Sequence, residues 1–365
     1  MCKIKLHIVG THGVPAKYGG FETLADYLCQ YLGNKYDITV YCNSKKYKVK
    51  QSTYCGASLI YLPLDASGAT GIIYDAITFF HACLKTDIIL YLSPVGSGFI
   101  TPLKYIFGKK VVINHGGLNE WEREKLTWLQ KKWAKFNHNV AAHFSDINIA
   151  DNYHYKESLK DNFGAESTVI SYGGDHVRKI YTSRKDLILK YPFTDKKYAV
   201  SVSRAQLDNN LHLVLACFES FLLYPLVLIS NWNVSSYGKK LYERYKASEN
   251  IILLDSIYDK EELDFLRSNA HVYIHSHSRC GTAPSLIEAM NHKLPVISFD
   301  APANRETTQE KAIYFKSSNH LKEVLSNLNK IVLNETSRNM YDIASSKYTW
   351  HKISSQYNKL FESLM

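Results

Sequence analysis

Short apolar runs alternate with longer amphipathic segments through the first half of the chain. The apolar runs have the length and composition of buried strands, whereas the amphipathic segments repeat apolar residues at helical spacing. Strand-like runs lie near 4–9, 38–42, 58–62, 88–92, 110–114, 146–149 and 168–172, and helical patterns near 21–32, 71–84, 99–107, 120–138 and 152–163. This alternation predicts a mostly parallel sheet covered by helices on both faces.

The alternation stops around residues 172–175, and residues 176–197 are mainly polar and charged. It restarts with strand-like runs at 198–203, 226–230, 251–254, 271–275, 295–299 and 312–315. We therefore expect two Rossmann-like domains, 1–175 and 176–345. Residues 346–365 should form a terminal helix, whose apolar stripe of Trp350, Ile353, Tyr357 and Leu360 needs a surface on which to dock.

Composition favours a soluble globular protein, since 45% of the 365 residues are hydrophobic and 21% are charged. The longest apolar runs, 71–84 and 214–229, are too short or too interrupted to span a bilayer, and the opening MCKIKLHIVG has no apolar signal region. A cytoplasmic protein is therefore expected. The seven cysteines are odd in number and form no Cys-x-x-Cys, so we expect neither a disulfide framework nor a zinc ribbon.

The net charge of +10 is compatible with nucleic acid, an anionic membrane or a polyphosphate ligand. The basic residues are spread over both halves, and no helix-turn-helix, zinc-finger or RNA-binding motif accompanies them. No nucleic-acid partner is therefore expected. The fifteen histidines are scattered and form no His-x-x-x-His pair on a predicted helix, so the sequence does not indicate a metal site.

The stretch 271–299 is typical of a strand–loop–helix–strand unit. Gly281 and Thr282 lie in the loop, and Pro284 suits the first helical position because its missing amide proton would be unpaired there. The amides of Ala283, Ser285 and Leu286 should then face an anion.

Glu288 lies within the otherwise apolar part of the same predicted helix. A carboxylate in that position costs free energy unless it is hydrogen-bonded, and a ribose diol would be a suitable partner. The alternative is an ordinary strand–helix unit whose Glu288 faces solvent. Arg204 directly follows the strand at 198–203 and has the forked geometry that grips a diphosphate. Together these residues describe a site for a nucleoside diphosphate in the second domain.

Two loops of the first domain also carry candidate residues. Gly19 and Gly20 precede a helix without a Gly-x-Gly-x-x-Gly or a phosphate-loop Lys-Ser/Thr, so their bare backbone could approach a phosphate or a sugar. Glu22 complements the helix dipole, and that structural role could be its whole role. His115, at a strand end, could contact a substrate hydroxyl or accept a proton, or else be satisfied by local backbone.

The predicted helix at 119–138 combines aromatic and basic side chains, among them Trp121, Trp128, Trp133, Lys132 and Lys135. Such a helix could rest on an anionic bilayer or a lipid-linked acceptor. Aromatic residues at this spacing could equally belong to the core.

These residues resemble the retaining glycosyltransferases of the GT-B fold, and the likeness extends over the whole chain. The strings GTHGVPAKYGGFETLADYL, INHGGLNEWEREK, IADNY, YGGDH and GTAPSLIEAM resemble the subgroup that moves L-rhamnose from dTDP-L-rhamnose to undecaprenyl-diphosphate-linked saccharides of capsule or cell wall. The resemblance implies two facing α/β domains, an N-terminal one for the acceptor and a C-terminal one for the nucleotide sugar. It also implies a last helix that crosses back to the first domain, contact with the cytoplasmic face of the membrane, and no metal or other cofactor.

The resemblance also implies roles for individual residues. Catalytic roles fall to His115, Arg204 and Glu288, and acceptor contacts to Glu22, His115 and Trp121. Donor contacts fall to Gly19, Gly20, Arg204, Asn209, Gly281, Thr282, Ala283, Pro284, Ser285, Leu286 and Glu288.

Two positions depart from the wider family. Cys280 replaces a glutamate that usually binds the donor sugar, and Asn209 replaces a phosphate-binding lysine. Donor binding should therefore depend on Arg204 and the helix amides. The rhamnosyl subgroup is similar at both positions, which favours rhamnose. The alternatives are a transferase that uses a UDP-hexose on another cell-envelope acceptor and a non-catalytic binder of nucleotide sugars; the absent Gly-x-Gly-x-x-Gly disfavours an NAD-dependent dehydrogenase.

Overall fold

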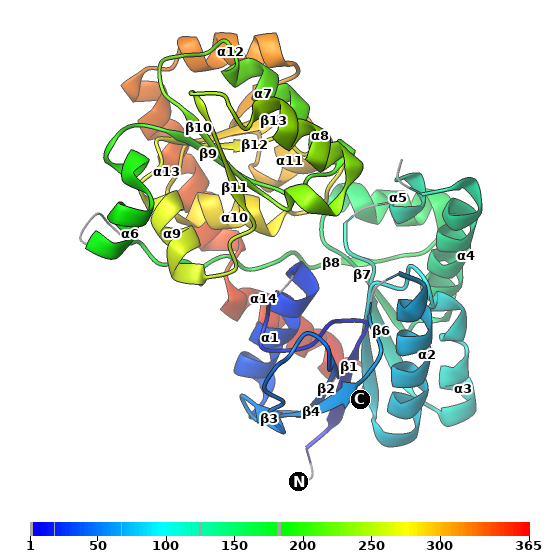
Figure 1. Cartoon of the computed structure of the whole chain (residues 1–365). Helices are drawn as coiled ribbons and strands as arrows, with labels where there is room; N and C mark the ends of the chain where they lie inside the picture. Colours follow the sequence, from blue (N-terminus) through cyan, green and yellow to red (C-terminus); the bar gives the residue numbers. More distant parts are fainter. Residues whose placement is uncertain (1–2, 18, 67, 118, 124–125, 181–183) are drawn as a thin grey trace. The chain divides into compact units, whose positions relative to one another are not determined.

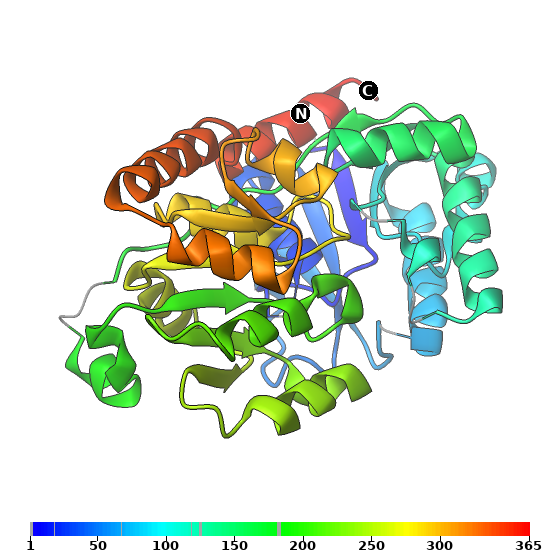
Figure 2. The same cartoon turned by 90° about the horizontal axis from the view of Figure 1, so that it is seen from above.

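The computed structural model describes residues 3–17, 19–66, 68–117, 119–123, 126–180 and 184–365 (Figures 1 and 2). The chain forms two compact units. Unit 1 comprises Met1–Tyr172 together with Trp350–Met365, and unit 2 comprises Gly173–Thr349. The structural divisions therefore fall after residues 172 and 349, whereas the sequence pattern placed them after 175 and 345.

Unit 1 is built on an eight-stranded sheet with the order β3-β4-β2-β1-β5-β6-β7-β8. Neighbouring strands are parallel except for the β3–β4 pair, which is antiparallel. The strands are β1 (Lys5–Val9), β2 (Asp37–Asn43), β3 (Thr53–Tyr54), β4 (Ala57–Leu62), β5 (Ile88–Leu92), β6 (Lys110–Asn114), β7 (Ile147–Ala150) and β8 (Thr168–Val169). Every residue of β5 is buried, as expected for a parallel strand covered on both faces.

The helices of unit 1 are α1 (Gly20–Leu32), α2 (Gly68–Lys85), α3 (Leu103–Phe107), α4 (Trp128–Phe144), α5 (Tyr153–Phe163) and α14 (Trp350–Glu362), with 3₁₀ turns η1 (Gly98–Ile100) and η2 (Glu120–Glu122). The predicted continuous helix at 119–138 is wrong. Its place is taken by η2 and by α4, which begins after Thr127 because that side chain and Gln130 form a capping box. Residues 124 and 125 of this stretch lie outside the described residues.

The C-terminal helix α14 completes unit 1. The Trp350 ring stacks on Tyr27 of α1 with centroids 4.3 Å apart. Asn114 at the end of β6 donates to the Tyr357 hydroxyl over 2.7 Å. The predicted apolar stripe therefore has its docking surface within unit 1, with Phe361 more deeply buried than Leu360.

Unit 2 carries a six-stranded parallel sheet with the order β11-β10-β9-β12-β13-β14. Its strands are β9 (Ala199–Val202), β10 (Leu226–Ser230), β11 (Ile251–Asp255), β12 (Val272–His275), β13 (Val296–Phe299) and β14 (Ile313–Phe315). Its helices are α6 (Lys185–Lys190), α7 (Leu211–Phe218), α8 (Ser236–Tyr245), α9 (Lys260–Ser268), α10 (Pro284–Asn291), α11 (Pro302–Thr307), α12 (Ser318–Ser326) and α13 (Lys330–Lys347), with 3₁₀ turns η3 (Pro192–Asp195), η4 (Leu207–Asn209) and η5 (Trp232–Val234). The predicted two-domain α/β architecture with parallel sheets is confirmed.

The strand order locates a crevice in each sheet. In unit 2 the chain runs outward from β9 to β10 and β11, then returns to place β12 on the other side of β9. In unit 1 the same reversal separates β1 from β5. Ligands of open α/β sheets bind beyond the carboxyl ends of the strands at such switch points. The loops that follow β9, β12 and β1 are therefore the ones to inspect.

Candidate functional site

The loops after β9 and β12 are hydrogen-bonded to each other at the switch point of unit 2. The amide of Ser278 donates to the carbonyl of Asp208 over 2.9 Å, and the Ser203 hydroxyl lies 2.8 Å from Nε2 of His277. The guanidinium of Arg204 is close enough to His277 to contribute to lowering its pKa, after burial and His275. The loop that carries Arg204 and the loop that leads into α10 thus form one surface, as the sequence predicted.

Helix α10 opens at Pro284 as predicted, and Ala283, its N-cap residue, makes no side-chain capping bond. Among the described residues, the backbone amides of Ala283 and Ser285 have no hydrogen-bond partner. The prediction for Leu286 is wrong, since its amide donates to the Ala283 carbonyl over 3.0 Å in a tight first turn. An anion at this helix start would therefore meet two amides rather than three.

Asn209 lies at the end of η4, with its side chain turned back on its own loop. Its Nδ2 donates to the carbonyl of Arg204 over 2.8 Å, and the residue is only 7% exposed. This hydrogen bond fixes the backbone from which the Arg204 side chain extends. Asn209 can thus support the donor site by holding Arg204 in place, which differs from the phosphate contact of the lysine it replaces.

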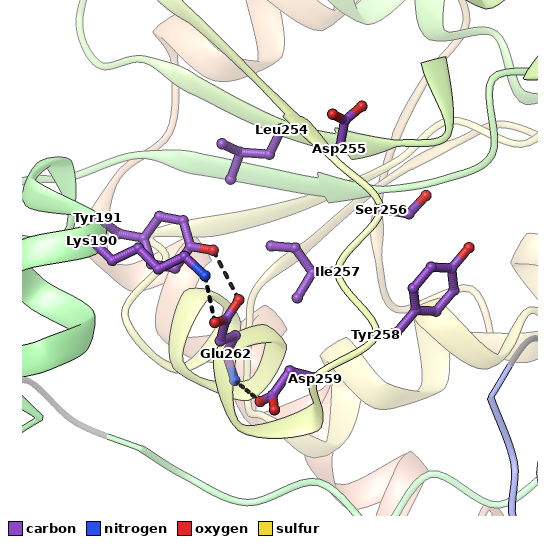
Figure 3. Close-up of a pocket in the computed structure, with 9 residues that line it drawn as sticks. All are labelled: Lys190, Tyr191, Leu254, Asp255, Ser256, Ile257, Tyr258, Asp259 and Glu262. Atoms are coloured by element: carbon purple, nitrogen blue, oxygen red, sulfur yellow. Dashed lines mark hydrogen bonds and ion pairs between the residues drawn. The ribbon is translucent and has the colours of Figure 1, made fainter. Parts of the chain in front are cut away.

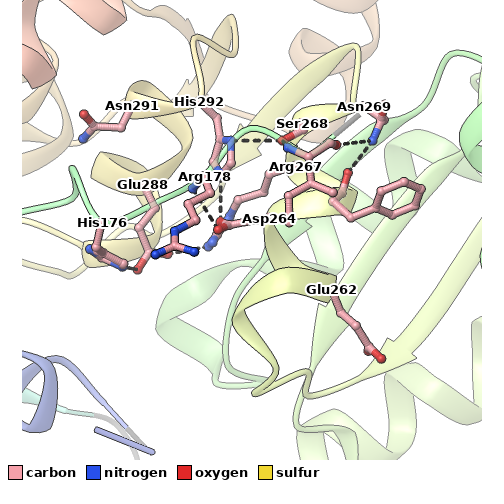
Figure 4. Close-up of polar contacts among 12 residues, drawn as sticks. His176, Arg178, Glu262, Asp264, Arg267, Ser268, Asn269, Glu288, Asn291 and His292 are labelled. Atoms are coloured by element: carbon pink, nitrogen blue, oxygen red, sulfur yellow. Dashed lines mark hydrogen bonds and ion pairs between the residues drawn. The ribbon is translucent and has the colours of Figure 1, made fainter. Parts of the chain in front are cut away.

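Glu288 neither faces solvent nor lacks partners. Its Oε2 lies 2.6 Å from Nη2 of Arg267, and its Oε1 lies 3.2 Å from Nε2 of His176 (Figure 4). Burial raises the pKa of the Glu288 carboxyl, but the charge of Arg267 and the hydrogen bond to His176 outweigh that effect and lower it to about 2. The side chain is largely buried but remains 16% exposed, so the ionised carboxylate can still accept a hydrogen bond from a ligand hydroxyl.

The residues that hold Glu288 were not singled out by the sequence. Arg267 is only 2% exposed, and its neighbour on α9, Asp264, accepts hydrogen bonds from the amide of Arg178 and from Nε2 of His292, both over 2.9 Å (Figure 4). The sequence does contain a signal for this ion pair, because Arg267 directly follows the apolar residues 265–266 on the same helix. A buried charge of that kind requires a partner.

A hollow of about 470 Å³ lies beyond the carboxyl end of β11, on the same sheet edge as the loops after β9 and β12 (Figure 3). On one side of it the Tyr191 hydroxyl donates to Glu262 over 3.1 Å, and Lys190 makes an ion pair with the same carboxylate. The residues that line it are Lys190, Tyr191, Leu254, Asp255, Ser256, Ile257, Tyr258, Asp259 and Glu262. This loop is not among the predicted site residues, although its position after a strand is a signal that could have identified it.

In unit 1, Glu22 braces the loop that follows β1. Its Oε1 accepts hydrogen bonds from the hydroxyl of Thr11 over 3.1 Å and from the amide of His12 over 2.9 Å. Gly19 is the N-cap of α1, and a Cβ added there would lie 3.0 Å from Oε2 of Glu22. Gly19, Gly20 and Glu22 therefore lie together where the loop beyond the carboxyl end of β1 enters α1. The buried carboxylate of Glu22, 5% exposed, is used inside that loop.

His115 is buried, and both of its ring nitrogens are engaged within unit 1. Nε2 lies 2.8 Å from Oδ1 of Asn148, and Nδ1 lies 3.1 Å from Nδ1 of His138. Burial lowers the pKa of His115 to about 4, so the ring is neutral near pH 7. This environment agrees with the second interpretation of His115, a histidine whose hydrogen bonds are made within the protein. The partner is mainly the Asn148 side chain, whereas the sequence suggested local backbone. Trp121, 5% exposed, packs on the rings of His138 and Phe163 and presents almost no surface to an acceptor.

The comparisons with known proteins divide the chain in a similar way. Residues 3–175 match the family described as DUF1972, a domain of unknown function, and residues 183–347 match the family described as glycosyl transferases group 1. No curated protein matches the sequence.

Solved structures match along almost the whole chain. Sucrose-phosphate synthase from Thermosynechococcus elongatus superposes with a TM-score of 0.83 at 14% identity, covering 99% of both chains. Anabaena HepE in complex with UDP-glucose gives a TM-score of 0.74 at 14% identity, covering 99% of this chain and 100% of HepE. A glycosyltransferase from Rickettsia africae gives 0.72 at 13% identity, covering 99% and 98% of the two chains.

Proposed function

We propose that the protein, whose residues 183–347 match the glycosyl transferases group 1 family and whose fold is GT-B, transfers L-rhamnose from dTDP-L-rhamnose to a lipid-linked saccharide. The acceptor would be an undecaprenyl-diphosphate-linked sugar of capsule or cell-wall synthesis, and the anomeric configuration would be retained. The observation that carries the proposal is the single surface made by the Arg204 loop and the start of α10 at the β9–β12 switch point.

Each residue of that surface has a chemical task in the proposed reaction. The bond between the anomeric carbon and the leaving diphosphate breaks, and negative charge develops on the diphosphate. The Arg204 guanidinium and the amides of Ala283 and Ser285 stabilise that charge. The acceptor oxygen forms the new bond to the anomeric carbon on the same face of the sugar, and the leaving diphosphate takes the proton of that acceptor hydroxyl. Glu288, ionised because of Arg267, accepts a hydrogen bond from the 3′-hydroxyl of the pentose, which is the free hydroxyl of the deoxyribose in a dTDP donor.

Contacts of Gly19 and Gly20 with the donor stay predictions. A direct contact between His115 and a substrate would require its ring to give up Asn148 or His138. The proposed chemistry therefore relies on unit 2 residues for the charge that develops and does not assign a proton transfer to His115.

A UDP-hexose donor is the second candidate, because the similar HepE structure is in complex with UDP-glucose. Isothermal titration calorimetry of the full chain against dTDP-L-rhamnose, dTDP-glucose, UDP-glucose and the free nucleotides separates base preference from sugar preference. We expect dTDP-L-rhamnose to bind at least about tenfold more tightly than UDP-glucose, a difference of about 1.4 kcal/mol. Tighter binding of UDP-glucose would reverse the donor assignment. Tight donor binding without transfer to any lipid-linked acceptor would support the non-catalytic binder.

Helix α4 supports the lipid-linked acceptor and the membrane contact. It buries small or polar residues such as Ala134, Asn137 and Ala141, whereas Trp128 and Leu129 are 65% and 69% exposed. The alternative that its aromatics form the core therefore does not hold for Trp128, Trp133 and Phe136. Ring contacts continue this exposed apolar surface onto neighbouring elements through Phe99–Trp133, Tyr105–Phe144 and Phe80–Phe107. No helix among the described residues is long and apolar enough to cross a bilayer.

The membrane contact predicts binding to vesicles that contain anionic phospholipid. Aromatic side chains next to Lys132 and Lys135 should insert at the interface while the lysines attract the headgroups. In a flotation assay, the protein should rise with such vesicles, and replacing Trp128 and Leu129 by alanine should release most of it. Replacing Leu222 and Leu223, 75% and 73% exposed in unit 2, provides the matched control. Absence of flotation with the unaltered chain would rule out the membrane contact.

A further inference from the structure

We propose that unit 2 binds Zn²⁺ through His275, His277 and Cys280, at the end of β12 and in the loop that leads to α10. One ligand atom of each residue, an imidazole nitrogen or the sulfur, lies within 4.8 Å of the other two. Two imidazoles and one thiolate form a ligand set that Zn²⁺ accepts, with Zn–N near 2.1 Å, Zn–S near 2.3 Å and a water at the fourth position. This site goes beyond the proposed transfer, which uses Arg204, the α10 amides and Glu288.

His275, at the end of β12, is 1% exposed. Both histidines would bind the ion as neutral imidazoles, which lose no proton on coordination. The thiol of Cys280 loses one, so the binding step is Zn²⁺ plus thiol giving Zn-thiolate and a released H⁺.

The ligand atoms need only a small movement to close around an ion. Nε2 of His275 lies 3.9 Å from Sγ of Cys280, and the two imidazole centroids are 4.3 Å apart. Ligand atoms on a tetrahedral zinc are about 3.5 Å apart for the bond lengths above, so closure requires shifts on the order of 1 Å or less. Cys280 lies in a partly exposed loop, which leaves a route for the ion.

Neighbouring side chains hold the ligands in orientation. The Ser203 hydroxyl lies 2.8 Å from Nε2 of His277, which leaves Nδ1 of that ring for the metal. Asn304 is fully buried, and its Nδ2 donates to the carbonyls of His277 and Phe299 over 2.8 and 2.9 Å. Oδ1 of Asn304 is thereby fixed as the acceptor of the Cys280 thiol over 3.3 Å, and this hydrogen bond ends when the thiol gives up its proton to become a metal ligand. The Ser203 contact is of the kind that orients histidine ligands on a metal.

Occupancy would also affect the site next to it. The positive charge of Arg204 already acts on His277. A bound Zn²⁺ would add positive charge beside it, and the thiolate of Cys280 would offset part of that added charge. The ion would tie the end of β12 to the loop that precedes α10. The segment that includes Gly281 and Thr282 should then open less often, which hydrogen exchange of the peptide covering residues 276–283 can measure.

Cobalt provides the decisive probe, because Co²⁺ occupies zinc sites and reports a bound thiolate by an absorption band in the near ultraviolet. Titrating the full chain with Co²⁺ should produce this band together with the visible bands of a four-coordinate ion, and Zn²⁺ should abolish both. The variant Cys280→Ser should lose the thiolate band and weaken Zn²⁺ binding by about 100-fold. Cys55→Ser, which removes an exposed thiol in unit 1, should change neither.

Two results would overturn the proposal: no thiolate band in the unaltered chain, or a band that persists in Cys280→Ser. His277→Gln serves as a second variant and should retain the band while weakening Zn²⁺ binding, with circular dichroism verifying that it folds. Donor calorimetry in the presence of chelator tests the proposed transferase function separately, so failure of one does not imply failure of the other.

Discussion

Replacing Arg204 by alanine should lower sugar transfer at saturating donor by about 10²–10³-fold. Arg204 is a cationic side chain two residues beyond the end of β9 at the switch point, and the charge that develops on the leaving diphosphate has to be stabilised there. Losing one such preorganised contact typically costs that factor in turnover. The measurement is the rate of nucleoside diphosphate release with dTDP-L-rhamnose and a lipid-linked acceptor.

Two further variants identify the cause of the loss. Arg204→Lys keeps the charge but not the fork, so it should recover only part of the activity. Arg244→Ala removes a guanidinium that is 64% exposed and paired with Glu219, and it should leave turnover unchanged. Near-normal turnover of Arg204→Ala at saturating donor would show that the diphosphate is stabilised elsewhere.

Replacing Arg267 by alanine should destabilise unit 2 by about 3–5 kcal/mol. The change leaves the Glu288 carboxylate without its closest partner in a largely buried setting, which is the costly half of breaking a buried ion pair. Hydrogen exchange of peptides from α9 and α10 reports the opening free energy of unit 2 independently of unit 1.

A double-mutant cycle tests the physical reason for that loss. If the cost comes from the stranded carboxylate, adding Glu288→Ala to Arg267→Ala should recover part of the stability. The control is Lys246→Ala, whose ion pair with Glu243 is exposed and should contribute less than about 1 kcal/mol. Equal effects of Arg267→Ala and Lys246→Ala would mean that the buried pair has no special role.

The sequence predicted the strands well because parallel strands buried on both faces read as continuous apolar runs. Strand β3 has two residues, Thr53 and Tyr54, and no apolar run surrounds it, whereas the equally short β8 lies within the apolar run at 168–172. The helix expected at 119–138 failed for a different reason. The helical spacing of its aromatic residues continued across Thr127 without a break. The new helix begins there because Thr127 and Gln130 form a capping box, and a pattern of apolar residues contains no information about these two polar side chains.

The sequence predicted only those parts of the candidate site whose positions are determined by the ends of strands. Arg204 and Pro284 follow β9 and β12, and parallel neighbours bring their ends together whatever the intervening sequence. The partners of Glu288 come from α9 and from the segment before α6, and nothing local to Glu288 announces them. Similarly, Asn148 and His138 decide that His115 is satisfied, and they belong to β7 and α4.

The placement of α14 has a consequence for how the protein is made. Unit 2 is one continuous stretch, Gly173–Thr349, whereas unit 1 is assembled from two pieces that flank it. During translation the whole of unit 2 leaves the ribosome before Trp350 can stack on Tyr27. Until then the face of α1 that receives α14 is uncovered. Most of unit 1 is therefore synthesised before unit 2, but unit 1 is completed after it.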